Sequence, residues 1–203
     1  MAEPDPAPRS ERYRAAIAAI DAANAEDPNR IIWRGEQHVK ELLHVQMMTD
    51  WVLELDPDAD ELQLIAARAH HLRRWKRPRS DYPDGRSGYL RWRAAAKRFH
   101  AEQVAGLLAA LDFSEDEIAR VGAIVRKEGL STDPAVQTHD DALCLVFLAT
   151  QLDDVAGRLG SDETVAVLTK TLPKLSPRGL EAAVNLPLDD WGRELLGRAR
   201  AAG

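Results

Sequence analysis

Apolar residues recur every three or four positions along most of the chain, which is the period of an amphipathic helix. The pattern predicts helices over about residues 10–27, 36–55, 60–75, 87–111, 114–129, 138–159 and 161–172, another from Ser176, and a last one over 188–202. No stretch alternates apolar and polar residues with β-branched types as a strand would, and no internal repeat is found. We therefore predict an all-α fold, a single-domain bundle of about eight or nine helices.

Local signals mark several boundaries. Ser114 with Glu117 three residues later forms a capping box, and Ser176 before Pro177 is a helix-start signal. Residues 76–88, KRPRSDYPDGRSG, have Pro or Gly every few positions and are the one long irregular connection, a candidate for function. Residues 1–9 are rich in Pro and are expected to be disordered, which leaves residues 10–203 as the helical domain.

Composition narrows the class of protein. A chain of 203 residues with 45% hydrophobic residues is long enough for one sizeable core. No apolar run is long enough for a membrane span or an export signal, so we expect a cytoplasmic protein without a membrane partner. The single cysteine, Cys144, lies among apolar neighbours and is expected to be a packing residue. Any bound metal would need nitrogen and oxygen ligands.

The charge is unevenly distributed. The net charge of −6 argues against general nucleic-acid binding, which needs a basic surface. Residues 68–98, however, hold eleven Lys or Arg and two Asp, a net charge of +9, which leaves −15 for the rest of the chain. This segment is either a solvated basic loop or an anion-binding surface.

Polar residues on apolar helix faces are the main candidates for chemistry, because burying an unpaired imidazole or carboxylate is costly. His100 precedes an apolar stripe at helical spacing, Asp141 begins another, and His71 lies at the edge of a third. Glu41 is a fourth candidate, with His44 on nearly the same face. The expected surface histidines are His38, His44, His70 and His139.

Two imidazoles and two carboxylates from separate helices can ligate iron, manganese or zinc, and helical bundles host such sites. We therefore predict a divalent transition-metal site formed by Glu41, His71, His100 and Asp141. The competing interpretation is structural: an inward histidine is often a hydrogen-bonded core residue, and an Asp at a helix start is often a cap.

Arginine and aromatic residues are concentrated in the segment that follows His71. Guanidinium groups bind carboxylate or phosphate through two points, and neighbouring rings can stack a planar group. The predicted substrate-binding residues are Arg73, Arg74, Arg79, Tyr82, Tyr89, Trp92 and Arg93. The alternative is that the rings anchor the irregular segment to the core.

Several long strings of residues resemble a known family. They are KELL (40–43), AARAHHLRRW (66–75), PRSDYP (78–83), GYLRWR (88–93), FHAE (99–102) and DALCLVFL (141–148). On the basis of these strings, the chain from about Tyr13 to Leu186 resembles the family called domain of unknown function 4202. That family name implies no activity.

More remotely, the chain is similar to the HD superfamily of helical metal-dependent hydrolases. On that similarity His71 takes the place of the paired histidine, Asp141 that of the late aspartate, Glu41 or His44 that of the first ligand, and His100 is an additional ligand. Leu72 follows His71 where the superfamily has an aspartate, so at most one metal is expected.

The leading hypothesis is therefore an HD-like metal-dependent hydrolase of the phosphoesterase type, acting on a small anionic substrate. A non-haem iron oxygenase on the same scaffold is a second enzymatic option. The alternative from another class is a non-catalytic binding protein whose basic residues 73–93 dock an acidic ligand or partner.

Overall fold

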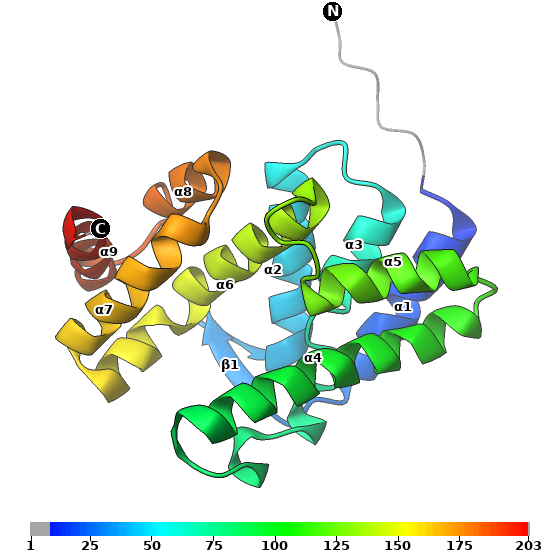
Figure 1. The fold of residues 1–203 in the computed structure, drawn as a ribbon, viewed down its shortest axis with the longest axis horizontal. Helices are drawn as coiled ribbons and strands as arrows, with labels where there is room; N and C mark the ends of the chain where they lie inside the picture. Colours follow the sequence, from blue (N-terminus) through cyan, green and yellow to red (C-terminus); the bar gives the residue numbers. More distant parts are fainter. Residues whose placement is uncertain (1–8, 203) are drawn as a thin grey trace, which may run out of the picture.

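The computed structural model describes residues 9–202 and confirms an all-α fold (Figure 1). The helices are α1 (Glu11–Ala25), α2 (Lys40–Leu55), α3 (Glu61–Arg68), α4 (Gly85–Ala109), α5 (Glu115–Arg126), α6 (Pro134–Leu159), α7 (Ser161–Thr171), α8 (Pro177–Val184) and α9 (Asp190–Ala202). In the described part of the chain, no helix is long and apolar enough to cross a membrane. Residues 1–9 are predicted to be disordered, and residues 1–8 of this segment lie outside the described range. The side chain of Arg9 donates a hydrogen bond to the carbonyl of Ala59.

Two apolar clusters form the core. The first joins α1, α3, α4 and α5 and includes Ile20, Ile65, Leu108 and Ile124. The second joins α2 and α6 to the C-terminal helices and includes Leu148. Figure 1 shows α7, α8 and α9 gathered at one end of the molecule and α1, α3 and α5 at the other, with α2 and α6 between them.

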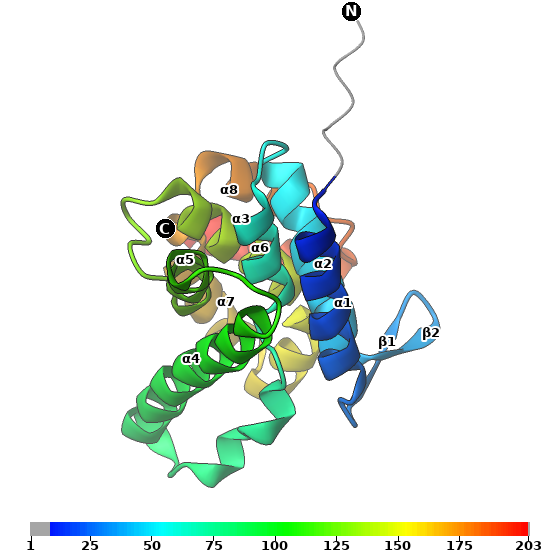
Figure 2. The ribbon, with the colours of Figure 1, turned by 90° about the vertical axis from the view of Figure 1, so that its right-hand side faces the viewer.

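A β-hairpin between α1 and α2 departs from the prediction. Strands β1 (Arg30–Trp33) and β2 (Glu36–Val39) pair antiparallel, with Trp33 opposite Glu36. The two turn residues, Arg34 and Gly35, both have positive φ, which suits the tight turn of a hairpin. The hairpin projects from the helical body (Figure 2), and Ile32 is exposed. The predicted helix over 36–55 therefore begins only at Lys40.

The third helix is shorter than predicted. It ends at Arg68 rather than near Trp75, and the chain continues through turns and two short 3-10 segments, η1 (Arg74–Lys76) and η2 (Arg79–Asp81). Arg73 has φ 55°, a left-handed conformation that redirects the backbone. His70 and His71 therefore lie in a turn rather than on a regular helix face.

The helix predicted over 138–159 begins four residues earlier. Pro134 is its first residue, and the Asp133 side chain caps it by accepting from the backbone N–H of Ala135. The predicted starts at Ser114 and Ser176 are both confirmed by side-chain caps.

Candidate functional site

Five histidines and one glutamate come together where α2, α4, α6 and the turn after α3 meet. The members of this histidine cluster are Glu41 and His44 from α2, His70 and His71 from the turn, His100 from α4 and His139 from α6. All of these side chains are buried except that of His71, which is 18% exposed. Ring centroids are 4.2 Å apart for His70 and His71, 4.7 Å for His70 and His139, and 5.6 Å for His71 and His100. Polar side chains thus form a continuous group between the two apolar clusters.

The start of α2 positions Glu41. Val39 at the N-cap supplies no side-chain hydrogen bond, and instead the Asp27 carboxylate accepts from the backbone N–H of Glu41 at 3.0 Å. The Glu41 carboxylate points inward, with Oε2 3.4 Å from Nδ1 of His71 and 4.0 Å from Nδ1 of His44. Oε2 is buried and accepts no hydrogen bond from the described residues. A buried carboxylate oxygen without a donor is costly, so this atom marks a place that fits a cation.

His100 is oriented by the backbone. Its Nδ1 lies 2.9 Å from the carbonyl oxygen of Leu72, an acceptor, so Nδ1 carries the proton. The other ring nitrogen, Nε2, is then the unprotonated one, the form that ligates a metal. Burial is the main cause that lowers the pKa of His100 to about 4, so the ring is neutral at pH 7.

The remaining rings are also held neutral by burial. Desolvation lowers the pKa of His44, and it lowers the pKa of His70 and His71 well below the ordinary value. The positive charge of Arg74 adds to this effect on His71. Neutral imidazoles suit metal ligation and proton transfer, whereas imidazolium rings do not ligate metals.

A second pair of histidines extends the cluster toward α5. Nδ1 of His70 and Nε2 of His139 share a hydrogen bond of 2.7 Å. Nδ1 of His139 is buried and without a partner among the described residues. Burial, and then the nearby charge of Lys127, lowers the pKa of His139 to about 3. Lys127 is itself paired with Asp140, so this side of the cluster holds a partly buried ion pair.

Arg74 supplies the cation that faces Glu41 in the structure. Its Nε lies 4.0 Å from Oε1 of Glu41, and its Nη1 lies 3.1 and 2.9 Å from the two ring nitrogens of His71. The guanidinium also lies over the ring of Trp92, at 5.5 Å. The Arg74 side chain is 35% exposed, so the cluster reaches solvent at Arg74 and His71.

The structure separates Asp141 from the predicted ligands. Its carboxylate accepts from the backbone N–H and the hydroxyl of Ser176 and from the amide of Gln137. Gly179 packs against it so closely that an added Cβ would lie 2.6 Å from the Asp141 Cγ. In this structure these contacts use the Asp141 carboxylate to fix the start of α8 rather than to join the other predicted ligands.

The prediction that His44, His70 and His139 lie on the surface is wrong. Their exposed fractions are 4%, 6% and 0%. His139 lies on a second buried stripe of α6, with Val136 and Ala142, that a single apolar face did not reveal. Only His38 among the expected surface histidines is partly exposed, with 34% of its side chain accessible.

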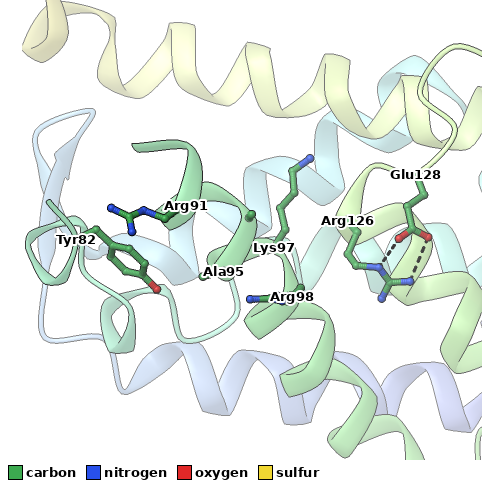
Figure 3. Close-up of a pocket in the computed structure, with 8 residues that line it drawn as sticks. Tyr82, Arg91, Ala95, Lys97, Arg98, Arg126 and Glu128 are labelled. Atoms are coloured by element: carbon green, nitrogen blue, oxygen red, sulfur yellow. Dashed lines mark hydrogen bonds and ion pairs between the residues drawn. The ribbon is translucent and has the colours of Figure 1, made fainter. Parts of the chain in front are cut away.

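The predicted arginine and aromatic set does not converge on one site. Arg73 and Arg79 are used internally, since Arg73 donates to Gln103 and Arg79 to the carbonyl of Tyr82. Trp92 donates to the carbonyl of Arg77, as an anchor would. The other predicted members lie in three places: Arg74 at the histidine cluster, Arg93 over the ring of Tyr89, and Tyr82 in a surface pocket beside α4 (Figure 3).

The cluster has the donor types of a metal centre, but its side chains are not closed around a point. Of the residues described, no three His, Cys, Asp or Glu side chains stand in an arrangement that would enclose an ion. Glu41 and His71 are the pair closest to ligand spacing, and His44 and His100 lie beside them. Movement of Arg74 and rotation of these rings are needed before an ion could be held.

Comparisons with known proteins supply a family and no activity. The family model described as Domain of unknown function (DUF4202) matches residues 14–196. No curated protein and no solved structure matches the chain.

Proposed function

The chain belongs to the DUF4202 family, and we propose that its histidine cluster is the metal centre of a hydrolase acting on a small phosphate-bearing substrate. The metal would be a divalent iron, manganese or zinc ion, held by nitrogen and oxygen donors. One observation carries this proposal: Glu41 Oε2 is buried, has no hydrogen-bond donor within residues 9–202, and faces Nδ1 of both His71 and His44.

The spacing of this pair is compatible with shared ligation. Ligand atoms about 2.1 Å from a tetrahedral ion are about 3.4 Å apart. The separation of Glu41 Oε2 and His71 Nδ1 is 3.4 Å, and that of Oε2 and His44 Nδ1 is 4.0 Å. Glu41, His44, His71 and His100 are therefore the proposed ligand set, with His44 taking the place first given to Asp141.

The residues around the proposed ligand set have different roles in the proposed reaction. A bound ion supplies a water of lowered pKa, the nucleophile of hydrolysis. The Leu72 carbonyl holds His100 in the tautomer that leaves Nε2 free. Arg74, stacked on Trp92 and partly exposed, is the arginine best placed to neutralise an anionic group arriving from solvent.

The test begins with protein purified without a metal-affinity tag and treated with a chelator. Manganese, ferrous iron or zinc is added in turn, and the melting temperature and the hydrolysis of p-nitrophenyl phosphate are measured. An ion at a hundredfold excess over its Kd stabilises by about 2.7 kcal/mol, a rise of roughly 5–10 °C for a chain of this size. We expect such a rise, with hydrolysis, for at least one of the three ions.

Matched variants locate the effect. His100→Ala is expected to lose both the rise and the activity, whereas His38→Ala on the exposed hairpin keeps them. An unchanged melting temperature with all three ions would refute the metal centre. Binding of iron with oxygen consumption in place of hydrolysis would instead support the oxygenase option.

A second candidate is a binding protein without catalysis. It is favoured by the internal pairing within the cluster, where His70 bonds His139 and His100 bonds the backbone. On this account the cluster is a buried polar network, and basic residues bind an acidic ligand. The two candidates differ in the metal experiment, because a polar network gains no stability from added ions.

A further inference from the structure

The surface pocket beside α4, which we call the basic pocket, has a volume of about 620 Å³ (Figure 3). It is lined by Tyr82, the residue that follows η2, by α4, and by the end of α5 with the turn beyond. The polar lining residues are Tyr82, Arg91, Lys97, Arg98, Arg126 and Glu128. No member of the histidine cluster lines it, so the basic pocket is a separate site.

The basic pocket has an excess of unpaired positive charge. Four cationic side chains line it against one carboxylate, and that carboxylate, Glu128, is already paired with Arg126 at 2.7 Å. Within residues 9–202, Arg91, Lys97 and Arg98 have no carboxylate partner within 4.0 Å. Three free cations around one hollow attract an anion of more than one charge.

The position of Lys97 strengthens this reading. Its side chain is only partly exposed, and burial lowers its pKa, with further lowering by the charges of Lys127 and Arg93. The nearby carboxylates of Asp140 and Glu128 offset part of this lowering, and an anion bound next to the partly desolvated ammonium group would stabilise its charge further. The chain of −6 net charge thus keeps a local positive site on this face.

The rest of the lining offers an apolar surface beside the charges. Ala94 and Ala95 form a flat stretch of α4, and Figure 3 shows the ring of Tyr82 at one side of the pocket, with Arg98 between it and the Arg126–Glu128 pair. An aromatic ring beside small side chains accommodates a planar group by stacking. The volume falls within the range of about 300–1,000 Å³ that is usual for sites of small organic ligands.

We infer that the basic pocket binds a small phosphorylated molecule that carries a planar ring, of the chemical class of a nucleoside mono- or diphosphate. Arg91 and Arg98 contact the phosphate oxygens, Tyr82 stacks on the ring, and Lys97, which Figure 3 shows directed away from Tyr82, adds positive charge at the edge of the pocket. This inference does not depend on the metal centre, because no ligand of the proposed ion takes part.

Isothermal titration calorimetry of the full chain with ADP tests the inference, in buffer of low ionic strength containing EDTA so that metal-dependent binding is excluded. Inorganic pyrophosphate and adenosine are titrated as the isolated halves of the probe. We expect ADP to bind more tightly than pyrophosphate and adenosine to bind weakest. Affinity for ADP falls as salt is raised, since the contacts are electrostatic.

Variants tie the binding to the pocket. Arg98→Gln and Arg91→Gln are each expected to weaken ADP binding about tenfold, the loss of roughly 1.4 kcal/mol. Arg158→Gln and Lys170→Gln, exposed and outside the pocket, make the same charge changes and are expected to leave the affinity unchanged. Unchanged melting temperatures confirm that the pocket variants fold.

Two results would overturn the inference. The first is the absence of ADP and pyrophosphate binding at millimolar concentration, or equal weakening by pocket and control variants. The second is equal affinity for ADP and pyrophosphate, which would remove the planar ring from the ligand class.

Discussion

The guanidinium of Arg74 lies against the ring of His71, with Nη1 within 3.1 Å of both ring nitrogens. The guanidinium thus lies over the face of the ring rather than along the lone pair of either nitrogen, and its charge faces the Glu41 carboxylate at 4.0 Å. We predict that Arg74→Gln tightens manganese binding about tenfold, because it removes a positive charge that repels an ion held by Glu41 and His71. Calorimetry of the chelator-treated protein measures this change.

The matched control for that variant is Arg77→Gln. Arg77 follows η1, lies over the ring of Phe99 at 5.1 Å, and is exposed. It is expected to leave metal affinity unchanged. Weaker binding in Arg74→Gln would mean that the guanidinium supports the ion rather than competing with it.

Glu41→Gln separates a functional carboxylate from a structural one. Because Oε2 is buried and no described residue donates to it, a neutral amide at this position is expected to raise the unfolding free energy of the metal-free protein by about 1 kcal/mol. Urea denaturation of both proteins measures the difference. Glu36→Gln, whose side chain is 83% exposed on β2, serves as control and is expected to change nothing. Lower stability of Glu41→Gln would assign the carboxylate to holding the fold.

For Asp141 we predict the opposite pattern, in which a substitution lowers stability and leaves metal binding unchanged. Asp141→Asn weakens the hydrogen bonds to Ser176 and Gln137 and is expected to cost about 1–3 kcal/mol of stability while leaving metal binding unchanged. Gly179→Ala is expected to destabilise in the same way, since its Cβ would press on the same carboxylate. Loss of metal binding in Asp141→Asn at unchanged stability would restore Asp141 as a ligand.

The buried histidines predict a dependence of stability on pH. The pKa of His139 is about 3 in the folded protein and near 6.5 when unfolded, so between these values only the unfolded state takes up the proton. The free energy of unfolding therefore falls as the pH decreases from 6.5 toward 3. His139→Gln is expected to reduce this slope by about 1.4 kcal/mol per pH unit, measured by denaturation at several pH values. The same slope in the variant would show that His139 is protonated in the folded state.

The helices could be predicted from the sequence because each buries an apolar stripe of regular period. The hairpin could not be predicted in this way, because each strand has only four residues. In addition, β2 carries two polar side chains, Gln37 and His38, between its ends. The β-branched pair Ile31–Ile32 before Gly35 was the available signal. The end of α3 could not be predicted because no Gly or Pro stands between Arg68 and Pro78, and the left-handed turn is made by Arg73.

The sequence predicts only part of the site, because the same periodicity that identifies helices has a limit. His71, His100 and Glu41 come together as expected, but helix periodicity identifies one buried face at a time. α6 contacts α2, α3, α5, α7 and α8, so it is buried on more than one face, and His139 was placed on the surface. Asp141 shares the apolar stripe for a different purpose, since its partner Ser176 is a cap on another helix. Periodicity cannot identify such a partner.

Elemental analysis gives the most direct test of the metal centre. The full chain and its Glu41→Gln variant are purified without an affinity tag, incubated with manganese, iron and zinc, dialysed and measured for bound metal. The account predicts roughly one divalent ion per chain in the unaltered protein and almost none in the variant. Equal metal contents in the two proteins, or none in either, would contradict it.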